Sequence, residues 1–372
     1  MKIATIETFS LHGSGDQGAY GAPYGFIVKV VSTDGVVGYG ETDSLPAVVD
    51  AVVKEPFLSE MMSGLAAVLI GANALDTSAA WERMERATLG YGRDGPVRHA
   101  MAAIDIALWD LKGKAEGRPV CSLLSGARRD RVRAYASHPL GASLEDTARH
   151  AQRLVAAGFT AVKFGWHPLG RDAEADEAIV RTLREAVGSK VDLLIDGGLA
   201  WDTSTAIARC ERFASYNLYW LEEPLAAYDF EGYAALRRAS PIRIAAGEMA
   251  ASRAELTRLV ESGGVDVLQV DVSRTGLTEA MRIAAVAERH SIPCVNHTYG
   301  YALNAAASLH FVAAIHDTDL FECQATPNEI RDALESAPLR PTDGWLSIPA
   351  SPGLGVAIDE ATLARFSPRH GA

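Results

Sequence analysis

Three acidic residues recur at one interval along the chain, and each follows an apolar run typical of a β-strand. Asp196 ends the run VDLLID, Glu222 ends LYWLE, and Glu248 ends RIAAGE, with equal spacing between the three. One strand, one helix and two loops of a barrel of alternating strands and helices occupy about that length of chain. The spacing therefore predicts three carboxylates at the C-terminal ends of successive parallel strands, where such barrels carry out chemistry.

Carboxylates that converge on one point repel one another unless a cation lies between them. Mg²⁺ commonly accepts carboxylates together with water and substrate oxygens, so we predict that Asp196, Glu222 and Glu248 bind Mg²⁺. Any one of them alone is as consistent with a helix N-cap or a surface charge. Because strand side chains alternate, only one glutamate of the pair Glu222-Glu223 can point into the barrel, and Glu222 is the predicted ligand.

Length and composition restrict the class of protein. A chain of 372 residues with 48% hydrophobic and 22% charged residues predicts two globular domains. No apolar run is long enough to cross a membrane, and the N-terminus reads as a strand rather than a signal peptide, so a cytoplasmic protein is expected. The net charge of −12 argues against nucleic acid or an anionic membrane as partner, but a small anionic substrate stays compatible with it.

The four cysteines have neither metal-ligand nor disulfide spacing, which predicts reduced and mostly buried thiols. They are Cys121, Cys210, Cys294 and Cys323.

The first part of the chain reads as a small α+β domain. Residues 2–12 and 25–41 alternate like antiparallel strands, with a turn at Asp34-Gly35. Between them, residues 13–25 are rich in glycine and tyrosine, which predicts a mobile loop that closes over a pocket. From about 46 to 116 the apolar spacing is helical.

From Arg131 onward, strand-like runs alternate with amphipathic helices. Eight such runs fit between residues 131 and 322, and most are followed by a helix, which predicts a parallel sheet closed into a barrel. The segment SPGLGVAID reads as a turn and a short strand, and the tail from about 345 is expected to return to the first domain.

Several motifs together carry a resemblance to a known family. IDG, LEEP and AAGE are followed by QVDVSRTG and VNHT, while GVVGYGE, IDIALWDLKGK and PGLG lie outside the barrel. Over nearly its whole length the chain resembles the mandelate racemase subgroup of the enolase superfamily. The resemblance implies an α/β fold with a modified TIM barrel, (β/α)7β, over residues 126–345. It also implies an α+β capping domain over residues 1–125, completed by residues 346–372.

The same resemblance implies an activity. Members of the subgroup use Mg²⁺ to assist removal of the proton next to a carboxylate, which gives an enediolate. A side-chain base can remove so weakly acidic a proton only if the developing charge is neutralised. A homo-oligomer is expected.

A histidine and an aspartate are the predicted base and its orienting partner. His297 ends the seventh predicted strand and Asp271 the sixth, and adjacent strands lie about 5 Å apart. Taken singly they read as a core histidine and a helix-capping aspartate, but both match the family's dyad. Glu322 ends the eighth strand and matches the family's electrophilic glutamate, which donates a hydrogen bond if burial keeps it protonated. In isolation it is an ordinary strand-end charge.

The second barrel strand departs from the racemase pattern. Racemases of the family carry Lys-x-Lys there, and the second lysine is a base on the opposite face of the substrate. This chain has Lys163-Phe164-Gly165, so a glycine takes the second position. The match of Lys163 to the first lysine implies a place near the substrate carboxylate, although a lysine at the barrel rim is the alternative.

Four aromatic or imidazole side chains are candidates for substrate contact. Trp166 and His167 follow the second strand, where a loop enters the pocket, and loop packing is equally consistent with them. Tyr20 and Tyr24 lie in the predicted loop, where they could hydrogen-bond sugar hydroxyls.

The preferred function is a dehydratase of sugar acids that gives a 2-keto-3-deoxy acid. One imidazole can take the α-proton and then protonate the departing hydroxyl, whereas racemisation needs a second base. A racemase or epimerase, or a sugar-lactone cycloisomerase, with Lys163 or His167 as second acid or base, is the alternative. A non-catalytic relative is the third reading, and the intact set of ligands and dyad argues against it. Specificity is expected to lie in two segments of the capping domain, residues 13–25 and about 43–56. The absence of arginine in residues 13–25 favours a monoacid; the particular acid stays open.

Overall fold

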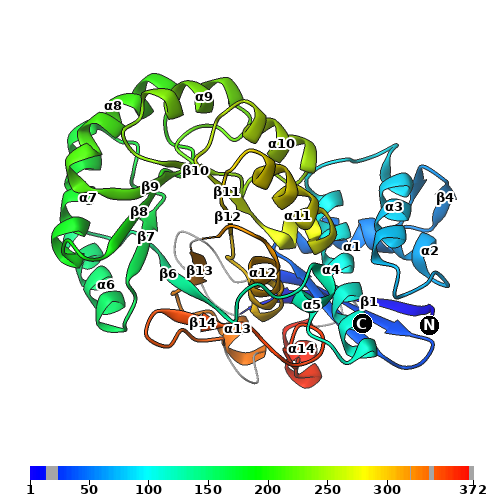
Figure 1. The fold of residues 1–372 in the computed structure, drawn as a ribbon. Helices are drawn as coiled ribbons and strands as arrows, with labels where there is room; N and C mark the ends of the chain where they lie inside the picture. Colours follow the sequence, from blue (N-terminus) through cyan, green and yellow to red (C-terminus); the bar gives the residue numbers. More distant parts are fainter. Residues whose placement is uncertain (14–23, 319, 335–338, 368–372) are drawn as a thin grey trace.

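The computed structural model describes residues 1–13, 24–318, 320–334 and 339–367 (Figure 1). Its N-terminal part begins with an antiparallel sheet in the order β1 (Ile3–His12), β2 (Tyr24–Ser32), β3 (Val37–Thr42). The predicted strands and their turn are confirmed, with Gly35 at a φ of 80°. Because β2 starts at Tyr24, the last two residues of the predicted loop 13–25 belong to the strand. Residues 14–23 of that loop, including Tyr20, lie outside the described residues.

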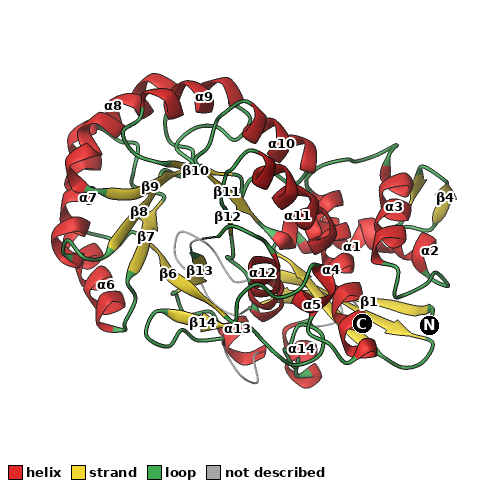
Figure 2. Ribbon diagram, in the orientation of Figure 1, coloured by secondary structure: helices red, strands yellow, loops and turns green. Residues whose placement is uncertain are grey.

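Helices cover one face of this sheet (Figure 2). The helices of this part are α1 (Pro46–Lys54), α2 (Leu65–Leu69), α3 (Thr77–Thr88), α4 (Pro96–Glu116) and α5 (Val120–Leu124), of which α1, α2 and α4 contact the sheet. The long helix α4 lies directly on β3, and glycine in the strand permits this approach. A Cβ at Gly40 would come 2.6 Å from the amide nitrogen of Ala107 in the helix. The predicted helical pattern over about 46–116 has one exception. A hairpin of β4 (Phe57–Ser59) and β5 (Met62–Ser63) interrupts it, and its Phe57 and Leu58 are exposed.

Eight parallel strands form a nearly closed barrel, and seven helices alternate with them (Figures 1 and 2). The strands are β6 (Arg131–Pro139), β7 (Ala161–Gly165), β8 (Asp192–Asp196), β9 (Leu218–Glu222), β10 (Ile244–Ala246), β11 (Val267–Val270), β12 (Cys294–Asn296) and β13 (Phe321–Gln324). The helices are α6 (Leu144–Ala156), α7 (Ala173–Val187), α8 (Thr203–Phe213), α9 (Phe230–Ala239), α10 (Arg253–Glu261), α11 (Val272–Arg289) and α12 (Ala302–Ala314), with a 3₁₀ turn at Ala214–Tyr216. The predicted (β/α)7β barrel is confirmed.

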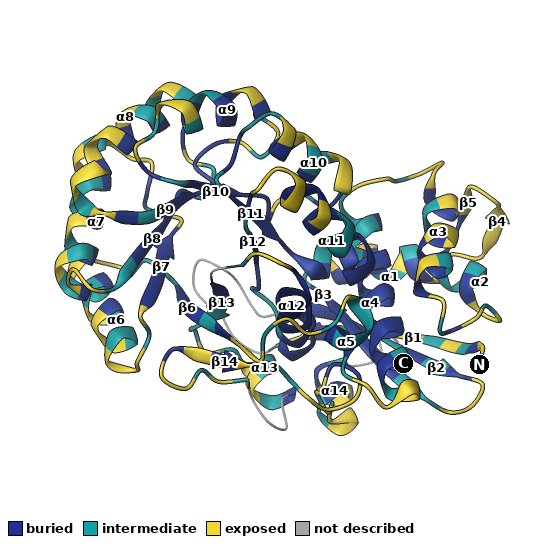
Figure 3. Cartoon of the chain, in the orientation of Figure 1, coloured by how far each residue is buried: buried dark blue, intermediate teal, exposed yellow. Residues whose placement is uncertain are grey.

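Side chains rather than a strand ladder join the two ends of the barrel sheet. The strand order runs from β12 through β6 to β13, and the Glu322 amide donates a 3.0 Å hydrogen bond to the Asn296 side-chain oxygen across the gap. Strands that are buried on both faces read as nearly continuous apolar runs. Figure 3 shows the barrel strands buried inside a ring of helices whose outer faces are exposed. The inner layer contains Tyr135, Ala161, Leu194, Trp220, Ala245, Val267, Val295 and Leu320.

The C-terminal segment contacts both parts of the chain. After α13 (Glu329–Leu334), β14 (Trp345–Ser347) pairs antiparallel with β6, and α14 (Glu360–Phe366) lies beside β1. Glu360 forms a 2.8 Å ion pair with Lys29 of β2. The predicted short strand in SPGLGVAID is wrong: the segment turns at Gly353 and Gly355, whose φ angles of 74° and 72° interrupt an extended strand. The domain boundaries themselves stay a prediction.

The cysteines agree with expectation, since all four are free and three are buried. Among the helices that the structure describes, none is long and apolar enough to cross a membrane.

Candidate active site

The three predicted carboxylates lie together at the C-terminal end of the barrel strands. Asp196 and Glu222 are the last residues of β8 and β9 and occupy paired positions in the ladder. Glu248 does not end β10 as expected, but follows it after Gly247, whose φ is 133°. All three are buried, and one oxygen of each lies within 4.8 Å of the others. We call Asp196, Glu222 and Glu248 the carboxylate cluster.

The neighbouring glutamate has a different place. Glu223 has a φ of 33°, and its carboxylate accepts hydrogen bonds from the amides of Gly247 (3.2 Å) and Met249 (3.4 Å). It therefore stabilises the turn that presents Glu248, while Glu222 joins the cluster. The alternation of side chains along β9 accounts for this division.

The cluster has the chemistry of a divalent-cation site. Burial raises the pKa of Asp196 to about 6 and that of Glu222 to about 7, because charged carboxylates are poorly solvated there. Glu248 Oε2 is buried and accepts no hydrogen bond from the described residues. The carboxylate oxygens of the cluster, including this oxygen of Glu248, therefore fit Mg²⁺, which prefers oxygen ligands.

Lys163 of β7 lies inside the barrel rather than at its rim, and its side chain is only 4% exposed. Its Nζ contacts Glu222 Oε1, lies 2.8 Å from Glu322 Oε1 and 3.8 Å from Asp196 Oδ2. Burial alone would lower the pKa of this amine, but Glu222 and Glu322 outweigh it and raise the pKa well above its usual value. The lysine is therefore a buried cation that compensates the carboxylates.

The predicted dyad is assembled at the ends of the next strands. His297 directly follows β12, and its Nδ1 lies 2.7 Å from Oδ2 of Asp271, which directly follows β11. Asp271 also caps α11, because its Oδ1 accepts the Ser273 amide at 2.7 Å. The other imidazole nitrogen, Nε2, lies 3.3 Å from Glu248 Oε2. Burial opposes a charged imidazole, yet Glu248, Glu322 and Asp271 together raise the pKa of His297 to about 10.

Glu322 lies within β13 rather than at its end, and it is fully buried. Its Oε2 accepts the Thr298 amide at 2.8 Å. Burial favours the protonated carboxyl, but the nearby cations Lys163 and His297 outweigh burial and lower its pKa. Glu322 is therefore charged in this arrangement, whereas the predicted donor role requires the protonated form.

No side chain fits at the position of the racemases' second lysine. A Cβ at Gly165 would overlap the Cβ and the carbonyl oxygen of Asp196 and would lie 2.8 Å from its Cα. The next residue, Trp166, has a φ of 67°, and its indole N–H donates a 2.8 Å hydrogen bond to Asp196 Oδ2. This bond orients one carboxylate of the cluster.

A cavity of about 260 Å³ opens over these groups. It is lined by Asp43, Ser137, His138, Pro139, Lys163, Gly165, Trp166, Asp196, Glu248, Met249, Arg274, His297, Tyr299 and Glu322. Of the substrate contacts predicted within the described residues, Trp166 lines this cavity, but the exposed His167 and Tyr24 do not. The Tyr24 carbonyl instead accepts the Tyr301 hydroxyl at 2.8 Å.

Sequence reasoning missed several lining residues, among them Asp43, His138 and Arg274. A signal for Arg274 was present, because it stands in QVDVSRTG one helical turn after Asp271. Asp43 follows the strand motif GVVGYGE at the start of the segment of about 43–56 where specificity is expected, but nothing local singles out this residue.

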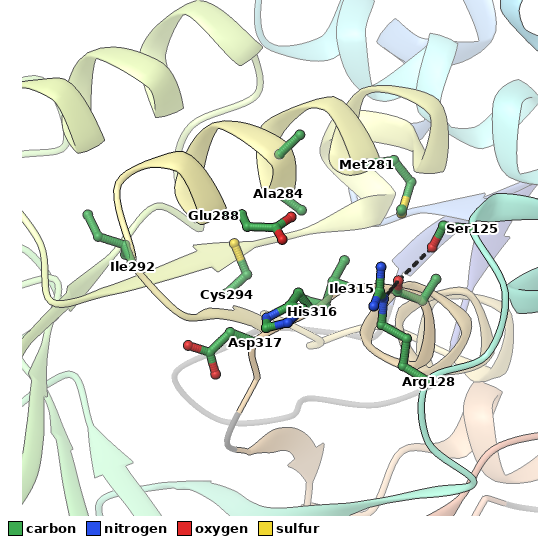
Figure 4. Close-up of a pocket in the computed structure, with 12 residues that line it drawn as sticks. Ser125, Arg128, Met281, Ala284, Glu288, Ile292, Cys294, Ile315, His316 and Asp317 are labelled. Carbon is green, nitrogen blue, oxygen red and sulfur yellow. Dashed lines mark hydrogen bonds between the residues drawn. The ribbon is translucent and has the colours of Figure 1, made fainter.

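A second and smaller cavity, of about 120 Å³, lies at the opposite end of the barrel, near the start of β12 (Figure 4). Ser125 and Arg128 at its edge already donate to the Ala314 carbonyl, at 2.6 and 3.2 Å. Its lining lacks a carboxylate cluster or a base comparable to those of the first cavity.

Fold and site together define a class: barrel enzymes that bear acidic residues on successive strand ends, with a histidine–aspartate pair beside them. Residues 146–362 match the family described as enolase C-terminal domain-like, and residues 18–125 match the mandelate racemase / muconate lactonizing enzyme N-terminal domain. The chain belongs to this mandelate racemase / muconate lactonizing enzyme family of the enolase superfamily.

Relatives with named activities extend over nearly the whole chain. The chain is 32% identical to D-galactarolactone cycloisomerase of Agrobacterium fabrum, covering 98% of this chain and 99% of the relative. It is 33% identical to D-galactonate dehydratase of Ralstonia pickettii, covering 99% of this chain and 94% of the relative.

Solved structures agree with this assignment. The 3,6-anhydro-D-galactonate cycloisomerase of Zobellia galactanivorans superposes with a TM-score of 0.90 at 30% identity, covering 98% of this chain and 99% of that chain. A racemase of Streptomyces coelicolor A3(2) with bound magnesium has a TM-score of 0.87 at 28% identity, covering 98% and 99%.

Proposed function

We propose that the protein is a Mg²⁺-dependent sugar acid dehydratase, a lyase that converts the acid to a 2-keto-3-deoxy acid. The observation that carries the proposal is the asymmetry of the site. The His297–Asp271 pair faces the cavity from one side, while Gly165 on the other side leaves no room for a second base. Elimination needs a single acid/base, whereas inversion at carbon normally needs two.

The carboxylate cluster would hold the metal. Bound Mg²⁺ supplies positive charge that neutralises the substrate carboxylate as the α-carbon loses its proton. Lys163, whose Nζ already lies among Asp196, Glu222 and Glu322, is placed to bind the same substrate carboxylate.

His297 carries the proton in both halves of the reaction. With the charge of the adjacent Glu248 neutralised by a bound cation, the imidazole would be neutral. Its Nε2 would then take the α-proton, while the electrons of the C–H bond move into the carboxylate to form the enediolate. The enediolate then expels the β-hydroxyl, which leaves as water with the proton that His297 returns, and the enol tautomerises to the ketone. Asp271 holds Nδ1–H at 2.7 Å, so it sets the tautomer and stabilises the imidazolium.

The direct test is an assay of sugar monoacids and diacids for 2-keto acid formation with and without Mg²⁺. We expect Mg²⁺-dependent loss of one water from at least one acid. The dehydratases among the relatives support this choice. Purified protein that gives no 2-keto acid from any member of the panel would contradict it.

A cycloisomerase acting on a sugar lactone is the second candidate, because two cycloisomerases also match nearly the whole chain. The product separates the two functions. A cycloisomerase gives an isomer of unchanged mass, whereas a dehydratase product has lost water.

A further inference from the structure

The substrate cavity contains one described residue of the capping domain, Asp43, which follows β3. Its carboxylate meets the guanidinium of Arg274 on α11, with Nη2 at 2.8 Å from Oδ2 and Nε at 3.4 Å from Oδ1. The two side chains are 21% and 16% exposed, so the pair lies at the cavity wall rather than in bulk solvent. Burial opposes the charged form of Asp43, but the charge and hydrogen bonds of Arg274 outweigh it and lower the pKa of Asp43 to about 2.

The third nitrogen of the Arg274 guanidinium also has a partner. Its Nη1 donates to the Glu248 carbonyl at 2.7 Å, and its Nε lies 3.6 Å from Asp271 Oδ2. The charge of Arg274 is therefore compensated by two carboxylates. The planar fork that would bind a substrate carboxylate is already in use.

The other basic side chains of the described cavity wall do not offer a cation to the distal end either. In the proposed function Lys163 and His297 serve the reacting end of the substrate, where they contact Glu222, Glu322 and Asp271. Nδ1 of His138 lies 2.7 Å from the Pro139 carbonyl, and burial lowers the pKa of this imidazole, so it is neutral. In the sequence of residues 14–23, Asp16 is the one charged residue.

We propose that the site takes sugar monoacids with a neutral, hydroxylated distal end and rejects diacids. The inference rests on the proposed function, in which the carboxylate cluster and Lys163 receive the reacting carboxylate. A second carboxylate at the capping-domain end would meet ionised Asp43, and the described lining residues offer no free cation to pair with it. Burying an unpaired charge is costly. Hydroxyls suit the cavity, because the lining residues Asp43, Ser137 and His138 offer hydrogen-bonding groups.

The test compares aldonates with aldarates of the same length and configuration, which differ only at the distal carbon. We expect kcat/KM for 2-keto acid formation with Mg²⁺ to favour the monoacid by at least about tenfold, since one unpaired charge separates the two. Asp43→Asn removes the negative charge and releases Arg274, so the ratio should move toward the diacid by a similar factor. Asp50→Asn is the matched control: the same domain loses the same charge, but Asp50 bonds Thr8 and Lys54 and does not line the described cavity.

Binding separates this inference from the proposed function. Calorimetry on the His297→Asn variant with Mg²⁺ should give a lower Kd for the monoacid than for the diacid. A wild-type enzyme that prefers the diacid overturns the inference, as does an unchanged ratio in folded Asp43→Asn. Tighter binding of the monoacid without 2-keto acid formation by the wild type would uphold the inference and overturn the dehydratase.

Discussion

Gly165 lies so close to Asp196 that a Cβ on the glycine would overlap the Cβ of the aspartate. This close approach links two features of the site. It excludes a second base at residue 165, and it bears on the position of the Asp196 carboxylate. A longer side chain at residue 165 must displace β8, and Asp196 with it.

We therefore expect Gly165→Ala to lower Mg²⁺ affinity by about tenfold or more, because supports of metal ligands have effects of this size. Mg²⁺ titration by calorimetry measures it. Gly117→Ala is the control for lost stability alone: Gly117 caps α4 with a φ of 65°, and a Cβ there would meet no atom within 4 Å. Equal Mg²⁺ affinities in the two variants would contradict the role of the close approach.

Isosteric changes test the carboxylate cluster. Glu222→Gln, Asp196→Asn and Glu248→Gln should each weaken Mg²⁺ binding and nearly abolish turnover, because each removes an anionic ligand. Glu223→Gln is the matched control, since a Gln oxygen can still accept from Gly247 and Met249. Full turnover after exhaustive chelation would refute the metal requirement.

His297→Asn should remove both exchange of the α-proton and elimination. In deuterated water, NMR should show the wild type exchanging or eliminating only one epimer, because one face of the substrate has a base. Asp271→Asn should lose most activity at near wild-type Mg²⁺ affinity, since the imidazole loses its orienting partner. If His297→Asn still exchanged the proton and Lys163→Ala did not, the base would be Lys163, and an epimerase or cycloisomerase would be favoured.

Lys163→Met tests the buried cation. Without Mg²⁺ the variant should lose about 3–5 kcal/mol of unfolding free energy, because Glu222 and Glu322 are left without a partner. Saturating Mg²⁺ should restore part of the loss, and KM should rise while the preferred epimer stays the same. Urea unfolding with and without Mg²⁺ measures the first effect; an equal loss in both conditions would exclude charge compensation by the lysine.

Asp105 should make stability depend on pH. It lies buried on α4 and accepts hydrogen bonds from the Thr278 amide (2.8 Å) and hydroxyl (2.6 Å) of α11. Burial raises its pKa from 3.8 to about 7. Between these values the folded protein keeps a proton that the unfolded chain has lost, so its contribution is complete below pH 3.8 and is lost as pH rises toward 7.

The expected slope is about 1.4 kcal/mol per pH unit. Asp105→Asn should remove this slope, so the difference between the wild-type and variant free energies of unfolding should change by about that amount per pH unit from pH 4 to pH 7. Parallel curves over that range would show that Asp105 does not bind the proton.

Local patterns determined the framework of this protein. Alternating apolar residues and turn residues mark each strand, because burial repeats along the strand itself. The eight barrel strands and the interval between Asp196, Glu222 and Glu248 could therefore be predicted from the sequence, and so could the adjacency of Asp271 and His297. Gly165 was visible as a departure from the racemase pattern.

Only the tertiary structure decided how these groups meet. Asp43 and Arg274 are far apart in the chain and form a pair because the capping domain docks on the barrel. Lys163 turns inward, and it keeps Glu322 charged, because the charges around a buried group set its pKa. The close approach of Gly165 to Asp196 was likewise decided by the tertiary structure. Such contacts depend on the distances between elements, which three-dimensional packing sets and the local periodicity of the sequence does not encode.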